Sequence, residues 1–318
     1  MFDSGVGGLT VAHALHLLLP SERLIYFGDT AHLPYGDKSK ETIVKYSLGI
    51  ADFLLEQHCK VILIACNSAS ANAYEEVKAH AGDRAVVMNV IDPVVDHVCS
   101  QAVPEGDGGT RTIGIIGTKA TIDSGTYEKK ILQRAGEAGV DHPPGHRPDG
   151  SPLVQVNSLA TPLFVPMIEE GFVFDDISNA IIRSYLSRKE LEGIESLILG
   201  CTHYPIIRNQ ISRFFNFNVN VYDTARIVAQ EVQRFLTDND LLHAGQTGSS
   251  GQTAASGRTG AQGQAGAPVG AGVPGQPGAS EKEGASRFYV SDHTPYFEVI
   301  ANMFFNEKIC LEKKNIWK

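Results

Sequence analysis

The sequence has no apolar run approaching the roughly 20 residues of a membrane span, and its start at Met1, Phe2 and Asp3 does not resemble a signal peptide. It also has no CxxC pair, and its five cysteines are widely scattered, which argues against a disulfide framework and against a zinc site. The formal net charge is −9, whereas a general nucleic-acid binder normally carries a basic patch. We therefore expect a cytoplasmic protein that binds neither nucleic acid nor membrane and holds no metal.

The 318 residues are long for a single core and fit two domains. Short apolar runs alternate with helix-like patterns along the whole chain, which is typical of α/β proteins with parallel sheets. We expect two related α/β domains with the active site in the cleft between them. One domain would comprise residues 1–92 and 207–318, and the other residues 93–206.

Two short apolar runs end in the same way. Residues 61–65 are followed by Cys66, Asn67 and Ser68, and residues 196–200 are followed by Cys201, Thr202 and His203. Runs of this length, apolar on both faces, predict strands buried between layers of helices. Ligands of such sheets bind beyond the carboxyl ends of the strands. The two thiols are therefore expected to face one cleft.

A glycine-rich stretch, residues 4–8, follows the first short strand and precedes a helix-like pattern. It lacks the Gly-Lys-Ser/Thr ending of a nucleotide P-loop and the spacing of the dinucleotide fingerprint. As a nucleotide site it is weak. The backbone N–H groups of such a turn can instead bind a carboxylate.

The composition changes over residues 244–286, which are rich in Gly, Ala, Gln, Ser, Thr and Pro. Such a segment cannot bury enough apolar surface to offset the entropy cost of ordering, so we expect a disordered surface insertion. A strand at residues 287–292 and a helix at residues 297–304 indicate that the first domain continues beyond it.

A cysteine on each wall of a pocket suits inversion at a carbon that bears an acidic hydrogen. One thiolate removes the proton from one face while the opposite thiol delivers a proton to the other. A free thiol titrates near about 8.5, so modest tuning supplies both forms near neutral pH. The site must stabilise a carbanion by binding the substrate's carboxylate and excluding water.

Five motifs follow one another along the chain: Asp3-Ser4-Gly5-Val6-Gly7-Gly8-Leu9-Thr10, Asp29-Thr30 with Pro34-Tyr35-Gly36, Ala65-Cys66-Asn67-Ser68, Gly117-Thr118 with Ala120-Thr121, and Gly200-Cys201-Thr202-His203-Tyr204-Pro205. The content and order of this series give the chain a resemblance to the glutamate racemase family. It implies a cofactor-independent enzyme that interconverts L- and D-glutamate and supplies D-glutamate for peptidoglycan. It also implies a homodimer.

The resemblance further implies a role for particular residues. Cys66 would act on D-glutamate and Cys201 on L-glutamate, assisted by Asp3, His203 and Glu169. The substrate-binding residues would be Asp3, Ser4, Pro34, Tyr35, Gly36, Asn67, Ser68, Thr118, Thr121, Thr202 and His203. Ser68 stands where the family usually has Thr, and Thr161 where it usually has Cys. The remaining cysteines, Cys59, Cys99 and Cys310, lack motif context and are expected to be small core residues.

Other functions remain open on the residues alone. An aspartate or hydantoin racemase could use the same pair of thiols, although His203 favours glutamate because relatives that act on aspartate tend to carry Glu there. A decarboxylase of this fold would need only one cysteine. A binding protein or a thiol redox sensor could use the cleft without turnover, and a sensor should form a reversible Cys66–Cys201 disulfide.

Overall fold

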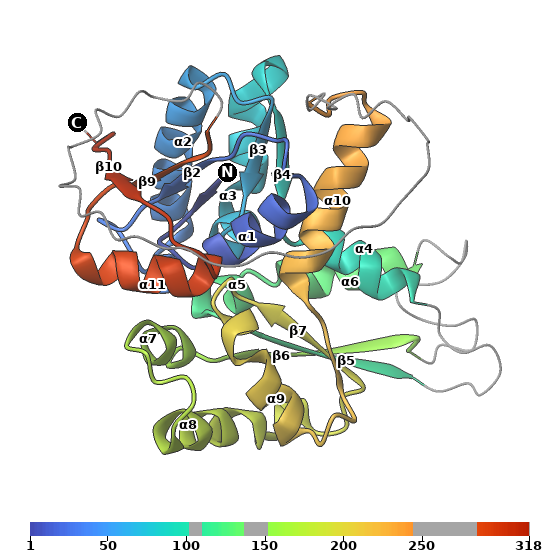
Figure 1. Ribbon diagram of the computed structural model, residues 1–318. Helices are drawn as coiled ribbons and strands as arrows, with labels where there is room; N and C mark the ends of the chain where they lie inside the picture. Colours follow the sequence, from blue (N-terminus) through green and yellow to red (C-terminus); the bar gives the residue numbers. More distant parts are fainter. Residues whose placement is uncertain (102–109, 137–151, 244–284, 318) are drawn as a thin grey trace, which may run out of the picture.

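The protein is described here from a computed structural model that covers residues 1–101, 110–136, 152–243 and 285–317. The strands divide between two sheets, in which every pairing is parallel (Figure 1). Most of the predicted insertion, residues 244–286, lies outside these described ranges. Within these ranges no helix is both long and apolar enough to cross a membrane.

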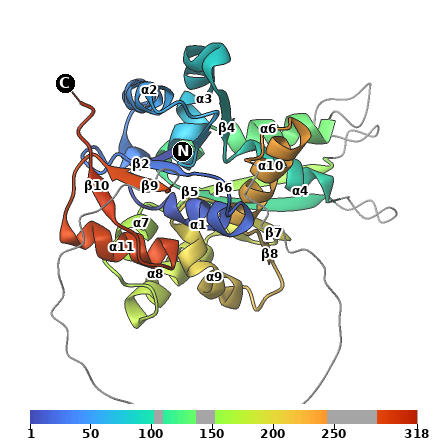
Figure 2. The same ribbon diagram turned by 45° about the horizontal axis from the view of Figure 1, so that its top comes forward.

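The first sheet has 6 strands in the order β10-β9-β2-β1-β3-β4. Its strands are β1 (Phe2–Asp3), β2 (Ile25–Gly28), β3 (Val61–Ile64), β4 (Val86–Asn89), β9 (Arg287–Val290) and β10 (Leu311–Lys313). Helices α1 (Leu9–Leu18), α10 (Thr224–Asp238) and α11 (Pro295–Phe305) lie on one face, and α2 (Lys40–Glu56) and α3 (Asn67–Ala81) on the other (Figure 2). The strand expected after the insertion is thus confirmed as β9, and it pairs with β2.

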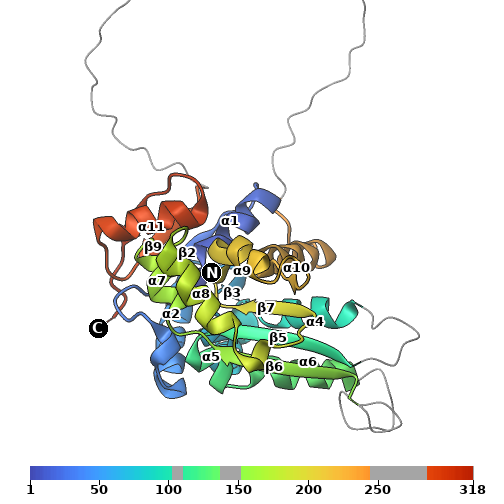
Figure 3. The same ribbon diagram turned by 90° about the horizontal axis from the view of Figure 1, so that it is seen from below.

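The second sheet has 4 strands in the order β6-β5-β7-β8. They are β5 (Arg111–Gly117), β6 (Val154–Ala160), β7 (Ser196–Gly200) and β8 (Asn220–Val221). Helices α5 (Lys119–Asp123) and α6 (Thr126–Gly136) lie on one side, and α8 (Asp176–Leu186) and α9 (Arg208–Phe214) on the other (Figure 3). Two further helices are α4 (Asp92–Ser100), which packs on α6 and α10, and α7 (Phe164–Glu169).

The pairing of β8 with β7 bears on the expected domain boundaries. Residues up to Val221 remain with the second sheet, whereas we expected the chain to return to the first domain at residue 207. β8 is only 2 residues long, too short to produce a recognisable apolar run. The expected α/β class with two parallel sheets is confirmed, while the division into domains stays a prediction.

Local sequence explains why the two cysteine strands form. β3 reads VILI and β7 reads SLILG, and all of their residues except Val61 are buried. Each strand lies in the interior of its sheet, where side chains on both faces are covered by helices. β7 ends directly before Cys201, and one residue separates the end of β3 from Cys66, so the sequence itself places the thiols at the carboxyl edges of the sheets.

Candidate active site

Polar residues gather where β1, β3, β5 and β7 end. Asp3 is the last residue of β1, Cys66 follows β3, Thr118 follows β5 and Cys201 follows β7. The carboxyl ends of parallel strands share one edge of a sheet, so each sheet contributes one thiol and one oxygen-bearing side chain. Both thiols are buried, with 5% of each cysteine exposed.

Cys66 occupies the N-cap position of α3. Its Sγ accepts a hydrogen bond from the backbone N–H of Ala69 at 3.5 Å and lies 3.6 Å from Oγ of Ser4. Burial, and after it the nearby charge of Asp3, raise the pKa of the Cys66 thiol to about 12. The N–H and Ser4 contacts oppose that rise but do not cancel it. In the free protein Cys66 is therefore a thiol near neutral pH.

Asp3 is fully buried and organises the glycine-rich turn. Its Oδ2 accepts hydrogen bonds from the N–H groups of Gly5 and Gly8, both at 3.1 Å. The turn does bind a carboxylate, as its sequence suggested, but the carboxylate is that of Asp3 and not a ligand's. Oδ1 of Asp3 is buried without a hydrogen-bond partner among the described residues, so it is free to accept a proton or an ammonium group.

Cys201 is part of a chain of three groups. Its Sγ lies 3.7 Å from Nδ1 of His203, and Nε2 of His203 lies 2.9 Å from Oε1 of Glu169. Burial by itself lowers the pKa of His203, but the contacts with Cys201 and Glu169 outweigh it and raise that pKa well above the ordinary value. The imidazolium is thereby favoured, and it can donate to Sγ of Cys201 and to Oε1 of Glu169 at once. The structure places Glu169 against His203, and the role of Glu169 in the reaction stays a prediction.

The glycine-rich turn after β1 contacts the segment that follows β7 in the second sheet. A Cβ placed on Gly7 would lie 2.3 Å from Cε1 of His203 and 2.8 Å from Oγ1 of Thr202. The Thr10 hydroxyl donates to the carbonyl oxygen of Thr202 at 3.0 Å. This turn therefore carries Asp3 on one side and meets the Cys201–His203 segment on the other.

A second bridge involves three hydroxyl groups. Ser68 Oγ lies 2.9 Å from Thr118 Oγ1 and 3.4 Å from Thr121 Oγ1, and the two threonines are 3.0 Å apart. A Cβ on Gly36 would lie 2.8 Å from Cβ of Thr118, so the loop at residues 34–36 belongs to the same group. The structure brings together residues that the sequence placed on three separate motifs.

The remaining predicted binding residues differ in their surroundings. Tyr35 is buried and donates to Asp29 Oδ2 at 2.7 Å, whereas Pro34 beside it is exposed. Asn67 is buried, and its Oδ1 accepts from the hydroxyl of Tyr127 at 2.8 Å. The sequence analysis missed Tyr127, whose ring also lies 3.5 Å from where a Cβ on Gly200 would stand, beside Cys201. No sequence pattern marks it, because its partners come from both sheets.

The three cysteines outside the motifs are less buried than Cys66 and Cys201. Cys59 and Cys99 are half-buried and Cys310 is exposed. Cys59 and Cys99 still pack against the apolar core, so the expectation of a core position was wrong only for Cys310. Among the described residues, no three His, Cys, Asp or Glu side chains are grouped to hold a metal ion.

The chain is similar to known proteins over most of its length. A family model described as Asp/Glu/Hydantoin racemase matches residues 10–232. The glutamate racemase of Aquifex aeolicus is 40% identical over 237 residues, which are 74% of this chain and 82% of that protein. The glutamate racemase of Geobacter metallireducens is 38% identical over 244 residues, 76% of this chain and 81% of that protein.

Solved structures give the same result. The glutamate racemase of Francisella tularensis, determined in complex with D-glutamate, superposes with a TM-score of 0.74 at 32% identity, covering 99% of this chain and 96% of that one. The enzyme from Thermus thermophilus superposes with a TM-score of 0.69 at 31% identity, covering 98% and 94%. On the sequence and the fold together, this chain belongs to the Asp/Glu racemase family and, within it, to the glutamate racemases, which are isomerases.

Proposed function

We propose that this protein interconverts L- and D-glutamate by proton transfer through Cys66 and Cys201, without a cofactor. The observation that carries the proposal is the pair of buried thiols, one after a strand of each sheet, each with its own polar partners. Cys66 has Asp3 and Ser4 nearby, and Cys201 has His203 backed by Glu169. Because the two thiols have different polar neighbours, one sulfur can act as base while the other acts as acid.

The roles follow from these environments. Cys201, with His203 beside its sulfur, would remove the α-proton of L-glutamate, while the protonated Cys66 would deliver a proton to the other face. In the reverse direction Cys66 must lose its proton, and the free Oδ1 of Asp3 is the nearby group that can accept it or hold the substrate's ammonium. The two carboxylates of the substrate would be bound by the hydroxyls of Ser68, Thr118 and Thr121. Further binding groups would come from Ser4, Asn67, Thr202 and the loop at residues 34–36.

The experiment is racemisation in deuterated solvent. With L-glutamate and wild-type protein, deuterium should appear at the α-carbon of the D-glutamate product before it appears in recovered L-glutamate, because the two faces exchange with different sulfurs. Cys66→Ala and Cys201→Ala should each abolish turnover while the protein stays folded, and Cys310→Ala serves as the control. Absence of α-deuterium with reduced wild-type protein, or faster turnover of aspartate than of glutamate, would contradict the proposal.

The family resemblance also supports proposals on the setting of the reaction. We propose that the D-glutamate is used for peptidoglycan synthesis in the cytoplasm and that the protein acts as a homodimer. A homodimer predicts twice the chain mass of 34.3 kDa in sedimentation equilibrium. A conditional loss of the gene should be rescued by added D-glutamate if the cell-wall role is correct.

A further inference from the structure

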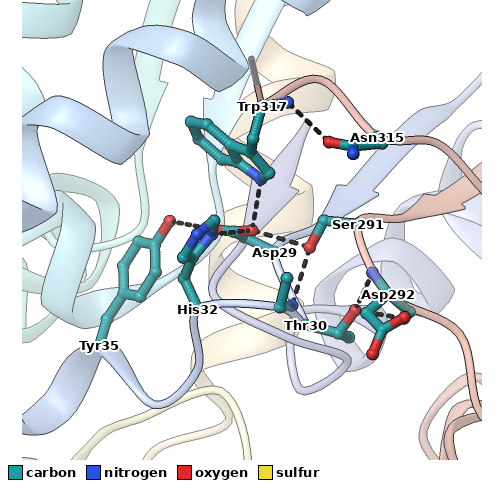
Figure 4. Close-up of polar contacts among 9 residues, drawn as sticks. Asp29, Thr30, His32, Tyr35, Ser291, Asp292, Asn315 and Trp317 are labelled. Atoms are coloured by element: carbon teal, nitrogen blue, oxygen red, sulfur yellow. Dashed lines mark hydrogen bonds and ion pairs between the residues drawn. The ribbon is translucent and has the colours of Figure 1, made fainter.

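Asp29 is a buried carboxylate that the proposed chemistry does not use. It follows β2, is 0% exposed, and receives polar groups from several directions (Figure 4). The groups are Tyr35 OH at 2.7 Å, Ser291 Oγ at 2.8 Å, His32 Nδ1 at 2.9 Å and Trp317 Nε1 at 3.1 Å. A carboxylate with so many donors is held in one place, and so are the donors.

Trp317 reaches this site because of the sheet topology. β2, β9 and β10 are neighbouring parallel strands, so the residues that follow them emerge at one edge of the sheet. Asp29 follows β2, Ser291 follows β9, and the segment after β10 leads to Trp317. The hydrogen bond between Trp317 and Asp29 therefore joins residues 288 positions apart in the chain.

Helix α2 has a space for the indole ring. Gly49 lies within this helix, where glycine is a poor helix former, and a Cβ at that position would lie 2.7 Å from Cζ3 of Trp317. The indole also packs edge-on against His32 and Tyr46, with ring centroids 4.9 Å and 5.4 Å apart. The indole ring occupies the space that a side chain at position 49 would need, which explains the glycine there. This packing supports the position of Trp317 independently of its hydrogen bond to Asp29.

Oδ2 of Asp29 accepts a hydrogen bond from Tyr35, the neighbour in sequence of Gly36 in the proposed substrate site. Tyr35 is 1% exposed, begins the single turn η1 (Tyr35–Asp37), and is bonded to Asp29 through its hydroxyl. Burial, and then the charge of Asp29, raise the pKa of Tyr35, so its hydroxyl stays protonated and keeps donating. The next residue, Gly36, packs against Thr118 of the three-hydroxyl group. Movement of Asp29 would therefore move the loop at residues 34–36.

We infer that Trp317 is a positioning residue for glutamate binding, which acts through Asp29 on the Tyr35–Gly36 loop. The inference rests on the proposed function, in which this loop binds substrate. Loss of the indole N–H leaves Asp29 Oδ1 with Ser291 and His32, so the carboxylate is not orphaned. The expected effect is hence a shift of the loop, seen in KM, and not a collapse of the fold.

Trp317 is also its own reporter, because the sequence contains only 1 tryptophan. Intrinsic tryptophan fluorescence therefore comes from this residue alone. In wild-type protein, titration with D-glutamate should change the emission of Trp317 with the same concentration dependence as KM. The change should vanish in Tyr35→Phe, which removes the hydroxyl that joins the loop to Asp29.

The kinetic test compares Trp317→Phe, which keeps a ring in the space beside Gly49 but loses the donor, with Lys313→Ala. Lys313 pairs with Asp292 on the exposed side of the same segment, at 2.6 Å, and does not touch Asp29. Loss of one hydrogen bond should raise KM for both enantiomers about three- to tenfold in Trp317→Phe, with kcat changed less than about twofold. Lys313→Ala should keep wild-type KM and kcat.

A second variant approaches the same contact from the helix. Gly49→Ala should improve helix propensity yet raise KM, because the new Cβ displaces the indole. In a Trp317→Ala background the same change should have no effect on KM, since nothing remains to be displaced. A wild-type KM in both Trp317→Phe and Gly49→Ala would overturn the positioning role. A kcat that falls in proportion to the amount of folded protein lost, with KM unchanged, would overturn it as well. Absence of turnover by wild-type protein would instead contradict the proposed function.

Discussion

Gly7 approaches His203 so closely that a Cβ on Gly7 would lie 2.3 Å from Cε1 and 2.4 Å from Nδ1 of the imidazole. Gly7 lies in the loop after β1 of the first sheet, and His203 in the loop after β7 of the second. His203 is the residue that contacts both Cys201 and Glu169. The absent side chain of Gly7 thus makes room for the imidazole beside Asp3's turn. Only glycine permits this approach with His203 in its observed position.

Replacement of Gly7 by Ala should therefore displace His203 from Cys201. A misplacement of about 1 Å near reacting groups can cost on the order of a hundredfold in rate, so we expect kcat/KM to fall by at least about tenfold. Gly5→Ala is the matched control in the same turn, because its Cβ would meet only Cδ2 of Leu33 at an ordinary 3.6 Å. Equal activity of the two variants would show that the Gly7–His203 contact is not needed.

Glu169→Gln tests the charge behind His203. In the folded protein the pKa of His203 is raised, partly by Glu169, so protonation of His203 stabilises the native state. This contribution is fully present below the unfolded pKa of about 6.5 and is lost as the pH rises through the raised folded pKa. Removing the charge should thus lower the free energy of unfolding by roughly 1–2 kcal/mol near pH 5.5 and by less at alkaline pH.

Urea unfolding at pH 5.5 and pH 9.5 measures that difference. The exposed neighbour Glu170 supplies the control variant, Glu170→Gln, which should change stability little at either pH. A destabilisation by Glu169→Gln that is the same at both pH values would show that the charge of Glu169 is not linked to the protonation of His203.

Much of this arrangement could be predicted from local sequence. The apolar runs before Cys66 and Cys201 predict buried parallel strands, and the rule for strand ends then places both thiols at sheet edges. The contacts that needed the structure join segments far apart in the chain. Asp3 accepts hydrogen bonds from the N–H groups of its own turn, and Trp317 donates to Asp29. Neither contact leaves a periodic or compositional signal in the sequence. β8 escaped prediction for a different reason, since two residues show no pattern.

The raised pKa of Cys66 predicts low thiol reactivity in the free protein. Alkylation by iodoacetamide requires the thiolate, and with a pKa of about 12 Cys66 should react slowly at pH 8 and faster at each higher pH up to that value. The exposed Cys310 should be modified first. In Asp3→Asn, loss of the neighbouring charge should lower the pKa and speed the alkylation of Cys66. Mass spectrometry of each cysteine peptide measures the rates, and modification of Cys66 as fast as Cys310 at pH 8 would contradict the buried, protonated thiol.

Ser68 and Ser70 both lie in the first turns of α3, but their hydroxyls point to different partners. Ser68 meets Thr118 of the second unit, whereas Ser70 donates to the carbonyl oxygen of Ile64 in the sheet at 2.9 Å. Ser68→Ala removes one hydroxyl of the proposed substrate site while Thr118 and Thr121 remain paired, so KM for both enantiomers should rise about three- to tenfold with little loss of stability. Ser70→Ala should do the reverse and lower the free energy of unfolding by about 1 kcal/mol with KM unchanged. Steady-state kinetics and urea unfolding of both variants separate the two roles, and an unchanged KM in Ser68→Ala would remove this hydroxyl from the binding site.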